Sequence, residues 1–265
     1  MLIAQISDLH VTVEGALVVG KLDSQATAAA AVARLNALQP RPDLVVITGD
    51  LVNGPKPGEY EALAPLLKPL TIPWCAIPGN HDDRVGLREF CAGQSWLPTD
   101  GPFFQYTIDH LPLRIIALDT QVPGEVPGML CDRRLDWLAD RLAEAPGRPT
   151  VLLMHHPPYE IGIGFMDKLR CFGRIERLAE LVEHHPAIER ILCGHVHRQT
   201  CIRWHGTLAS TVPAVSFQFA LQLDPEAKGL WTPEPPGIAL HYWRDGAGMV
   251  SHIQPIGDYP WISTR

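Results

Sequence analysis

The chain has 265 residues, a formal net charge of -7 and 46% hydrophobic residues. This composition is typical of a globular protein with one large core, so residues 1–265 are expected to form a single domain. No apolar segment approaches the ~20 residues that cross a bilayer, so no membrane association is expected. The sequence has no run of Lys or Arg, so nucleic-acid binding is not expected either.

The start of the chain and its cysteines indicate a cytoplasmic protein. MLIAQISDLH has neither a basic n-region nor a long apolar h-region, and it predicts a first strand rather than a signal peptide. The six cysteines include no CxxC pair. We therefore expect reduced thiols and no cysteine zinc site.

The first hundred residues alternate between apolar runs and helical patterns. Residues 2–6 predict a buried strand, and a helix is expected from Ser24, which can cap it, to Leu38. A second buried strand is predicted at 44–48. Residues 59–67 predict a helix, although Pro65 disfavours it because proline has no backbone N–H. A third strand at 74–77 ends in a Pro-Gly-Asn-His sequence.

The alternation continues to His197 and then gives way to short strands. In chain order we expect paired strands at 103–108 and 113–118, a helix from Asp132, a strand at 151–154, a helix around 175–181 and a strand at 191–193. Further strands are predicted at 200–204, 207–212, 238–242 and 249–253. The pattern predicts an α/β fold, with residues 213–265 as a β-rich C-terminal elaboration.

Five of the predicted strands end in a short polar cluster. The clusters are Asp8-Leu9-His10, Gly49-Asp50, Gly79-Asn80-His81-Asp82, His155-His156 and His195-Val196-His197. Ligands of α/β sheets bind in the crevice beyond the carboxyl ends of the strands, so the five clusters are expected to converge. One such pair alone is weak evidence, whereas five in succession indicate a site.

The residue types in these clusters are typical of a metal centre. Asp, His and Asn bind borderline or hard divalent cations, and the set is large enough for two ions. Asp50 can bridge two ions through its two carboxylate oxygens. The glycines before Asp50, Asn80 and His195 suit tight turns.

Some polar residues keep two interpretations. His156 either contacts the ligands or the substrate, or it is structural. Asp82 is expected to cap the following helix rather than to serve the site. Asp119 ends another strand, and we expect it to support the ligands or the fold rather than to bind metal.

The ordered set D-x-H, GD, GNHD, HH and GHxH resembles the calcineurin-like metallophosphoesterase superfamily, from Asp8 to His197. The resemblance is closest to class III cyclic-nucleotide phosphodiesterases and glycerophosphodiesterases. It implies a four-layer αββα sandwich and two divalent cations, which can be Mn, Fe, Zn or Co. It also implies that Asp8, His10, Asp50 and His197 bind the first ion and that Asp50, Asn80, His155 and His195 bind the second.

The resemblance further implies that His81 is catalytic beside the phosphate, and that Asn80, His81 and His197 contact the substrate. The expected activity is hydrolysis of a small phosphodiester, a 3',5'-cyclic nucleotide such as cAMP or a glycerophosphodiester, by a metal-bridging hydroxide. The alternatives are a phosphomonoesterase, a nuclease or a protein phosphatase of the same superfamily. A non-catalytic scaffold is not expected because every ligand is present. The apolar residues of 213–237 are compatible with a substrate rim or with a homo-oligomer contact.

Overall fold

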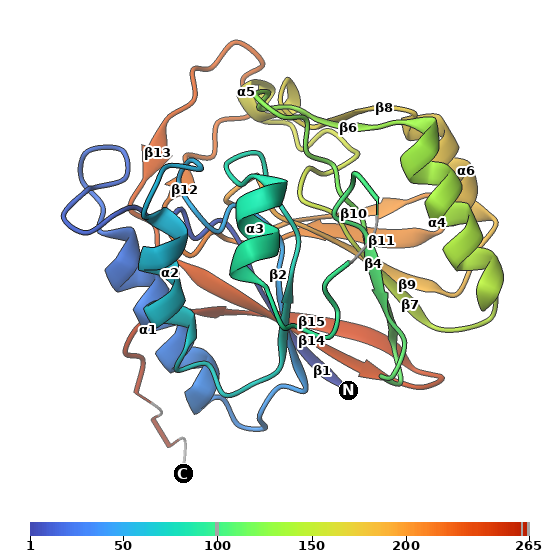
Figure 1. The fold of residues 1–265 in the computed structure, drawn as a ribbon, viewed down its shortest axis with the longest axis horizontal. Helices are drawn as coiled ribbons and strands as arrows, with labels where there is room; N and C mark the ends of the chain where they lie inside the picture. The colour runs from blue at the N-terminus through green and yellow to red at the C-terminus, as the bar shows by residue number, and fades with distance from the viewer. Residues whose placement is uncertain (99–100, 261, 264–265) are drawn as a thin grey trace.

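Two sheets form the centre of the computed structural model, which describes residues 1–98, 101–260, 262 and 263 (Figure 1). The five-stranded sheet has the order β15 (Gly248–Pro255), β14 (Gly237–Arg244), β1 (Leu2–Ile6), β2 (Leu44–Ile47) and β3 (Trp74–Ala76). The six-stranded sheet has the order β10 (Thr200–Trp204), β11 (Thr207–Thr211), β9 (Ile188–Cys193), β7 (Thr150–Leu153), β5 (Arg114–Ala117) and β4 (Tyr106–Ile108).

The central strands of both sheets are parallel. β1 pairs in parallel with β2, and β2 with β3, in the first sheet. β5, β7, β9 and β11 are parallel in the second sheet. Parallel strands end at the same edge of a sheet, so the segments that follow them emerge side by side.

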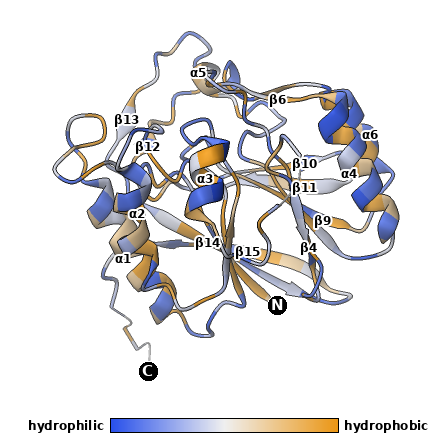
Figure 2. Cartoon of the chain, viewed as in Figure 1, coloured by the Kyte–Doolittle hydropathy of each residue, from blue (hydrophilic) through white to orange (hydrophobic). Residues whose placement is uncertain are grey.

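Helices cover the outer face of each sheet. α1 (Ser24–Ala37), α2 (Glu59–Leu67) and α3 (Arg84–Phe90) share one core with β1, β2 and β3. α4 (Asp132–Glu144) and α6 (Ile175–Glu183) share a second core with β7 and β9. Figure 2 shows both apolar and polar residues around α1 and α4, as expected of helices that bury one side.

The six-stranded sheet is buried on both faces. Leu153 of β7 and Leu192 of β9 pack in the core that includes the five-stranded sheet. Their neighbours Leu152 and Ile191 pack in the core that includes α4 and α6. This alternation follows from the two-residue period of a strand. The layers therefore run helices, sheet, sheet, helices, and the predicted four-layer αββα fold is confirmed.

A buried polar network joins the two sheets. Gln5 of β1 donates through Nε2 to Thr48 Oγ1 at 2.9 Å and to the carbonyl of Cys193 at 2.8 Å. His241 of β14 donates from Nε2 to Gln5 Oε1 at 3.0 Å and accepts at Nδ1 from Ser251 Oγ at 2.7 Å. Burial, with a smaller contribution from the charge of Arg190, lowers the pKa of His241 to about 3. The imidazole is therefore neutral in the folded protein at pH 7.

Two predictions of helix caps were wrong. Asp23, not Ser24, caps α1, because its carboxylate accepts from Ala26 N at 3.0 Å. Asp83, not Asp82, caps α3 by accepting from Val85 N and Gly86 N. Ser24 and Asp82 are instead buried. Ser24 Oγ accepts from Thr12 N, and the carboxylate of Asp82 accepts from Gly79 N. The helix that contains Pro65 is present over the predicted residues.

Short elements were absent from the prediction because they contain too few residues for a periodic pattern. They are β6 (Gly128–Leu130), α5 (Gly164–Asp167), β8 (Cys171–Gly173), β12 (Gln218–Phe219) and β13 (Trp231–Thr232). β12 pairs with β13 and β6 with β8, away from the two main sheets.

The C-terminal segment is connected to the rest of the fold through β14, which pairs antiparallel with β1. The single domain of 1–265 with 213–265 as an elaboration stays a prediction, and its residues 261, 264 and 265 lie outside the described part. Among the described helices, none combines the length and apolar character needed to cross a bilayer. All six cysteines lie within the described residues and are free thiols.

Candidate metal centre

The five polar clusters meet at the carboxyl ends of the parallel strands. Asp8, His10, Asp50 and His197 each offer one ligand atom, and these atoms lie within 4.8 Å of one another. All four side chains are buried. Residues from the ends of β1, β2 and β9 therefore share one centre, as the sequence predicted for these positions.

The first set is arranged around two facing imidazoles. Nε2 of His10 lies 3.1 Å from Nε2 of His197. His10 Nε2 is 3.6 Å from Asp50 Oδ2, and His197 Nε2 is 3.4 Å from Asp8 Oδ1. His197 donates from Nδ1 to the carbonyl of Phe217 at 2.6 Å, so its Nε2 presents a lone pair to the carboxylates.

The second set shares Asp50 with the first. Nε2 of His155 lies 3.4 Å from Asp50 Oδ2 and 3.2 Å from Asn80 Oδ1. His155 donates from Nδ1 to the carbonyl of Thr48 at 2.7 Å, which again leaves Nε2 as the ligand atom. His195 Nε2 is buried and has no hydrogen-bond partner. The ring centroid of His195 is 5.1 Å from that of His155.

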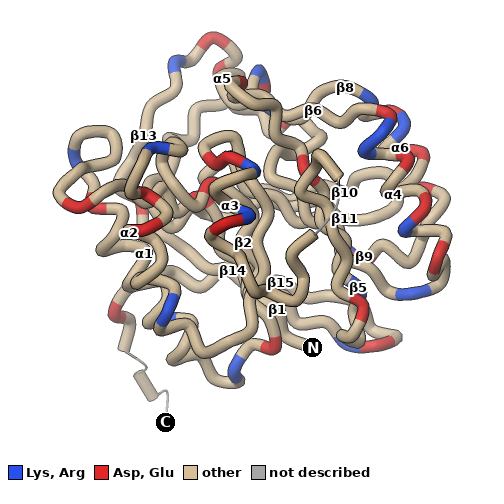
Figure 3. Tube along the Cα trace, in the orientation of Figure 1, with Lys and Arg blue, Asp and Glu red and all other residues tan. Residues whose placement is uncertain are grey.

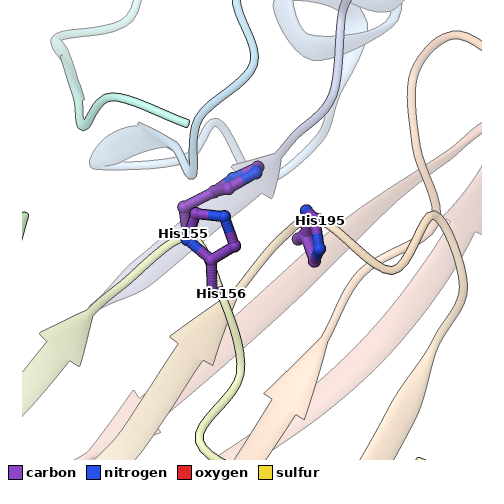
Figure 4. Close-up of side chains that lie close together, drawn as sticks. All are labelled: His155, His156 and His195. Carbon is purple, nitrogen blue, oxygen red and sulfur yellow. The ribbon is translucent and has the colours of Figure 1, made fainter. Parts of the chain in front are cut away.

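His156 lies close to this set but is already fully bonded. Figure 4 shows His155, His156 and His195 side by side, and their ligand atoms lie within 4.8 Å of one another. His156 accepts at Nδ1 from Thr120 Oγ1 at 2.8 Å and donates from Nε2 to the carbonyl of Val126 at 2.9 Å. With both nitrogens used, His156 fits the structural interpretation, and it anchors the segment from Thr120 to Val126.

His81 and its neighbour Asn80 contact different partners. The backbone N–H of His81 donates to Asp50 Oδ1 at 2.8 Å. Its ring donates from Nδ1 to the carbonyl of Asn53 at 2.6 Å, and the ring centroid lies 4.6 Å from that of His10. Nε2 of His81 is therefore the nitrogen available to a substrate in the adjoining pocket.

The backbone of the predicted ligands has an uncommon conformation. Asp8, His10, Asp50, His195 and His197 have φ values between 48° and 68°. Non-glycine residues rarely adopt this left-handed region, although Asp and His are enriched among those that do. Such strain typically gathers at functional sites, where the surrounding structure fixes it.

The glycines of the motifs permit close backbone approach. A Cβ on Gly79 would lie 2.1 Å from Asp50 Oδ1, and one on Gly194 would lie 2.1 Å from Ser7 Oγ. Gly49 has a φ of 100°, and its Cβ would meet His155 Nδ1 at 2.3 Å. The sequence attributed these glycines to tight turns, and the close packing of the ligands is the additional physical reason.

The electrostatics favour cation binding. Burial alone would raise the pKa of Asp50, but His155 and His81 outweigh it and hold that pKa well below the usual range. Burial lowers the pKa of both His10 and His195 to about 3, so these imidazoles are neutral at pH 7. Burial opposes protonation of His155, but Asp50 raises its pKa to about 9, so a cation that binds Nε2 of His155 must displace a proton from it. Neutral imidazoles and ionised carboxylates are the protonation states that bind metal.

These residues fit a pair of divalent cations. Two buried, ionised carboxylates, Asp8 and Asp50, have no Lys or Arg partner among the described ion pairs. Buried charge is costly unless it is paired or coordinates a metal. The unpartnered Nε2 of His195 and the facing Nε2 atoms of His10 and His197 could supply the remaining ligand atoms.

Asp82 and Asp119 support the loops around the centre. Asp82 accepts from Leu51 N at 3.2 Å, from Gly79 N at 2.9 Å and from the hydroxyl of Tyr60 at 3.2 Å. It thereby joins the loop after β2 to the loop after β3. Asp119 accepts from both Arg84 and Phe104 N, which places it in the fold rather than at the cations.

A pocket of about 570 Å³ opens over both ligand sets. His10, Asp50, Asn80, His195 and His197 line one side of it. None of the described residues that line it is Lys or Arg. Phe217 and Phe219, from a segment that is irregular in the sequence, also line it. The two interpretations of residues 213–237, a substrate rim or a homo-oligomer contact, stay predictions.

Other groups that shape the site could not be predicted from the residue types in the sequence. The carbonyl oxygens of Thr48, Phe217 and Asn53 orient His155, His197 and His81. Every residue has a carbonyl, so no sequence signal marks these three. Val18, Phe165 and Met166 also line the pocket, but apolar residues in irregular segments give no signal either.

The chain is similar in sequence to known phosphoesterases. A family model described as calcineurin-like phosphoesterase matches residues 1–199. Over 268 residues the chain is 34% identical to glycerophosphodiester phosphodiesterase GpdQ of Enterobacter lignolyticus, with 99% of this chain and 94% of that protein covered. Over 190 residues it is 30% identical to 3',5'-cyclic adenosine monophosphate phosphodiesterase CpdA of Escherichia coli, with 70% and 66% covered.

Solved structures agree in fold. A dimetal phosphatase from Danio rerio superposes with a TM-score of 0.70 at 14% identity, with 97% of this chain and 99% of that chain covered. The matched family, the converging Asp, His and Asn side chains and the αββα layers all lead to one assignment. The chain belongs to the calcineurin-like phosphoesterase family.

Proposed function

We propose that this protein is a phosphodiesterase that uses two divalent cations to hydrolyse small-molecule phosphodiesters, either a 3',5'-cyclic nucleotide such as cAMP or a glycerophosphodiester. The observation that carries the proposal is the position of Asp50. Its Oδ2 lies 3.6 Å from His10 Nε2 of one ligand set and 3.4 Å from His155 Nε2 of the other. A carboxylate between two sets of ligands is suited to bridge two ions.

The proposed ligands follow from this arrangement. Asp8, His10, Asp50 and His197 would bind the first cation, and Asp50, Asn80, His155 and His195 the second. When bound, the two ions would lower the pKa of a water to about 7 and stabilise charge on the phosphate as Lewis acids. The mixed N and O ligands suit Mn, Fe, Zn or Co, and availability often selects among such metals.

The protein supplies orientation and a proton donor. Asn53 fixes His81 through Nδ1, and when the ring carries both protons its Nε2 can donate a hydrogen bond to the phosphate or a proton to the leaving alkoxide. Asn80, His81 and His197 all line the pocket and are proposed to contact the substrate. The chain needs no nucleophilic Ser or Cys for this reaction.

The charge of the pocket favours a diester over a monoester. A phosphodiester has one negative charge and a phosphomonoester about two at neutral pH, because its second pKa is near 6. The described pocket lining has no Lys or Arg to balance the second charge. Figure 3 shows Lys and Arg dispersed among Asp and Glu, which does not favour a nuclease surface.

We also propose that the protein is cytoplasmic and can form a homo-oligomer. The six free thiols support a reducing compartment. Leu221, Leu223 and Leu230 are 59%, 67% and 53% exposed, and exposed apolar side chains are suited to contact a second copy. Light scattering on the purified protein measures the oligomeric state.

The test of the activity uses protein stripped of metal by a chelator and reloaded with Mn²⁺. We expect hydrolysis of bis(p-nitrophenyl) phosphate, with cAMP and glycerophosphoethanolamine as the candidate substrate classes, and a much lower kcat/KM for p-nitrophenyl phosphate. Asp50→Asn should abolish turnover and reduce the bound metal. His184→Ala, at an exposed histidine, is the matched control and should retain both.

Two results would contradict the proposal. One is full activity of the chelated protein without added metal. The other is a preference for the monoester over every diester tested, which would identify a phosphomonoesterase.

A further inference from the structure

The pocket over the metal centre has two chemically different sides. The ligand side is formed by the Asp, His and Asn residues of the two sets. The apolar side is formed by Val18, Val19, Val126, Phe165, Met166, Leu169, Phe217 and Phe219. A phosphodiester at the cations would therefore share the pocket with these apolar side chains.

This apolar side begins at the metal ligands themselves. The ring of Phe217 lies 4.5 Å from the ring of His197 and 5.6 Å from that of His10. Phe219 lies 5.0 Å from His197, and Phe165 lies 5.8 Å from Phe219. The three aromatic side chains thus form a series of ring contacts that begins at the proposed ligands His10 and His197.

Val19 on the same side has a strained backbone. Residues 18–21 form a turn in which Lys21 N donates to the carbonyl of Val18 at 3.1 Å. Both central residues have positive φ, 47° at Val19 and 70° at Gly20. This is the pattern of a type I′ turn, for which Asn-Gly is the preferred pair. A β-branched residue with positive φ is an outlier, so the turn would be more stable with Asn at position 19.

The turn contacts the strand pair that contains Phe219. Nζ of Lys21 lies 5.7 Å from the ring centroid of Trp231, in β13. β13 pairs with β12, which contains Phe219. The side chain of Val19 is 44% exposed, so burial in the core does not explain why Val occupies a position that suits Asn.

We infer that Val19 is a specificity-determining residue that, with Phe165 and Phe219, binds an apolar ester arm of the substrate, aromatic or alkyl. The inference rests on the proposed phosphodiesterase function. An apolar arm would bury surface against these side chains. A short polar arm, such as glycerol or ethanolamine, would gain nothing from them. The strained backbone of Val19 would then be retained because its apolar side chain contacts the substrate.

The test compares two diesters in the Mn²⁺-loaded wild type and Val19→Asn. For bis(p-nitrophenyl) phosphate, Val19→Asn should lower kcat/KM about 10-fold, a typical effect of losing one apolar contact in a pocket. For glycerophosphoethanolamine, followed by phosphorus NMR, kcat/KM should change less than about 2-fold, because no apolar arm is present. In the metal-free protein, Val19→Asn should raise Tm by about 2–4 °C.

The decisive quantity is the kcat/KM for bis(p-nitrophenyl) phosphate divided by the kcat/KM for glycerophosphoethanolamine. The control variant is Val250→Asn, which replaces a valine of similar exposure, 47%, on strand β15 and should leave this ratio unchanged. A second variant, Phe165→Ser, should lower the same ratio. An unchanged or raised ratio for Val19→Asn, or a lowered Tm, overturns the inference while hydrolysis by the wild type continues. Absence of hydrolysis of both diesters by the loaded wild type would instead overturn the proposed function.

Discussion

The backbone N–H of His195 donates to both carboxylate oxygens of Asp8, at 3.1 Å each. Asp8 belongs to the first ligand set and His195 to the second. The contact also joins the end of β1 in one sheet to the end of β9 in the other. The position of one proposed ligand set therefore depends on the other, and on how closely the two sheets approach.

Gly194 permits this approach, and Gly194→Ala should disrupt it. The added Cβ would lie 2.1 Å from Ser7 Oγ and 2.7 Å from the carbonyl of Thr48. Overpacking of this kind costs about 1–3 kcal/mol, and each kcal/mol lowers Tm by about 2–4 °C in a chain of this size. Thermal unfolding and metal analysis measure the two effects. Gly147→Ala has open space around its Cβ and is the control; equal Tm values for the two variants would refute the packing argument.

The two adjacent histidines after β7 should behave differently. His155→Gln should lose about one of two bound Mn²⁺ ions, because His155 Nε2 faces Asp50 and Asn80. His156→Gln should retain both ions, because Thr120 and Val126 already occupy its two nitrogens. Metal content is measured by elemental analysis after gel filtration. Loss of metal in the His156 variant alone would reverse this assignment.

His81→Ala should leave metal binding intact and slow the reaction. Removing a general acid typically costs 10²–10⁴-fold in rate. The loss in kcat should be near the upper end for a diester with a poor alkoxide leaving group and near the lower end for p-nitrophenolate, which needs little protonation. Steady-state kinetics on both substrate types provide the comparison. Equal losses for the two leaving groups would argue against proton donation by His81.

His241 should make the protein sensitive to acid. Its pKa is about 3 in the folded protein and about 6.5 in the unfolded chain. Between these values the unfolded chain binds the extra proton, so the free energy of unfolding falls as the pH falls, by about 1.4 kcal/mol per pH unit. Above pH 6.5 the neutral His241 imidazole does not reduce the free energy of unfolding. Between pH 6.5 and pH 3 this free energy falls as the pH falls.

In His241→Gln this titration is absent, while the other ionisable groups remain. The difference in unfolding free energy between wild type and variant should therefore shrink by about 2 kcal/mol from pH 7 to pH 5. Urea unfolding of the metal-free proteins at each pH measures it. A constant difference across this range would show that His241 titrates normally in the fold.

The strand ends with their polar clusters were predictable because buried parallel strands are apolar and metal ligands are not. Asp8, Asp50 and His155 therefore stand out where each strand stops. The alternation of strands and helices predicted an α/β fold, and the resemblance to the metallophosphoesterase superfamily implied its four αββα layers.

The apolar side of the pocket was not predictable. Val19 and Phe165 lie in segments without periodicity, and their common position results from packing among distant loops. The cap of α3 was assigned to Asp82 because Asp82 and Asp83 are chemically identical in the sequence. Only the backbone N–H groups of Gly79 and Leu51 distinguish them, since these draw Asp82 inward.

The position of the cations is the central claim, and anomalous diffraction from crystals of the Mn²⁺-loaded protein tests it most directly. Two anomalous peaks should lie about 3.5–4 Å apart, with the carboxylate of Asp50 between them, as in two-metal phosphatase sites. His10 and His197 should contact one peak, and His155 and His195 the other. A single peak, or two peaks that do not share Asp50, would contradict the account.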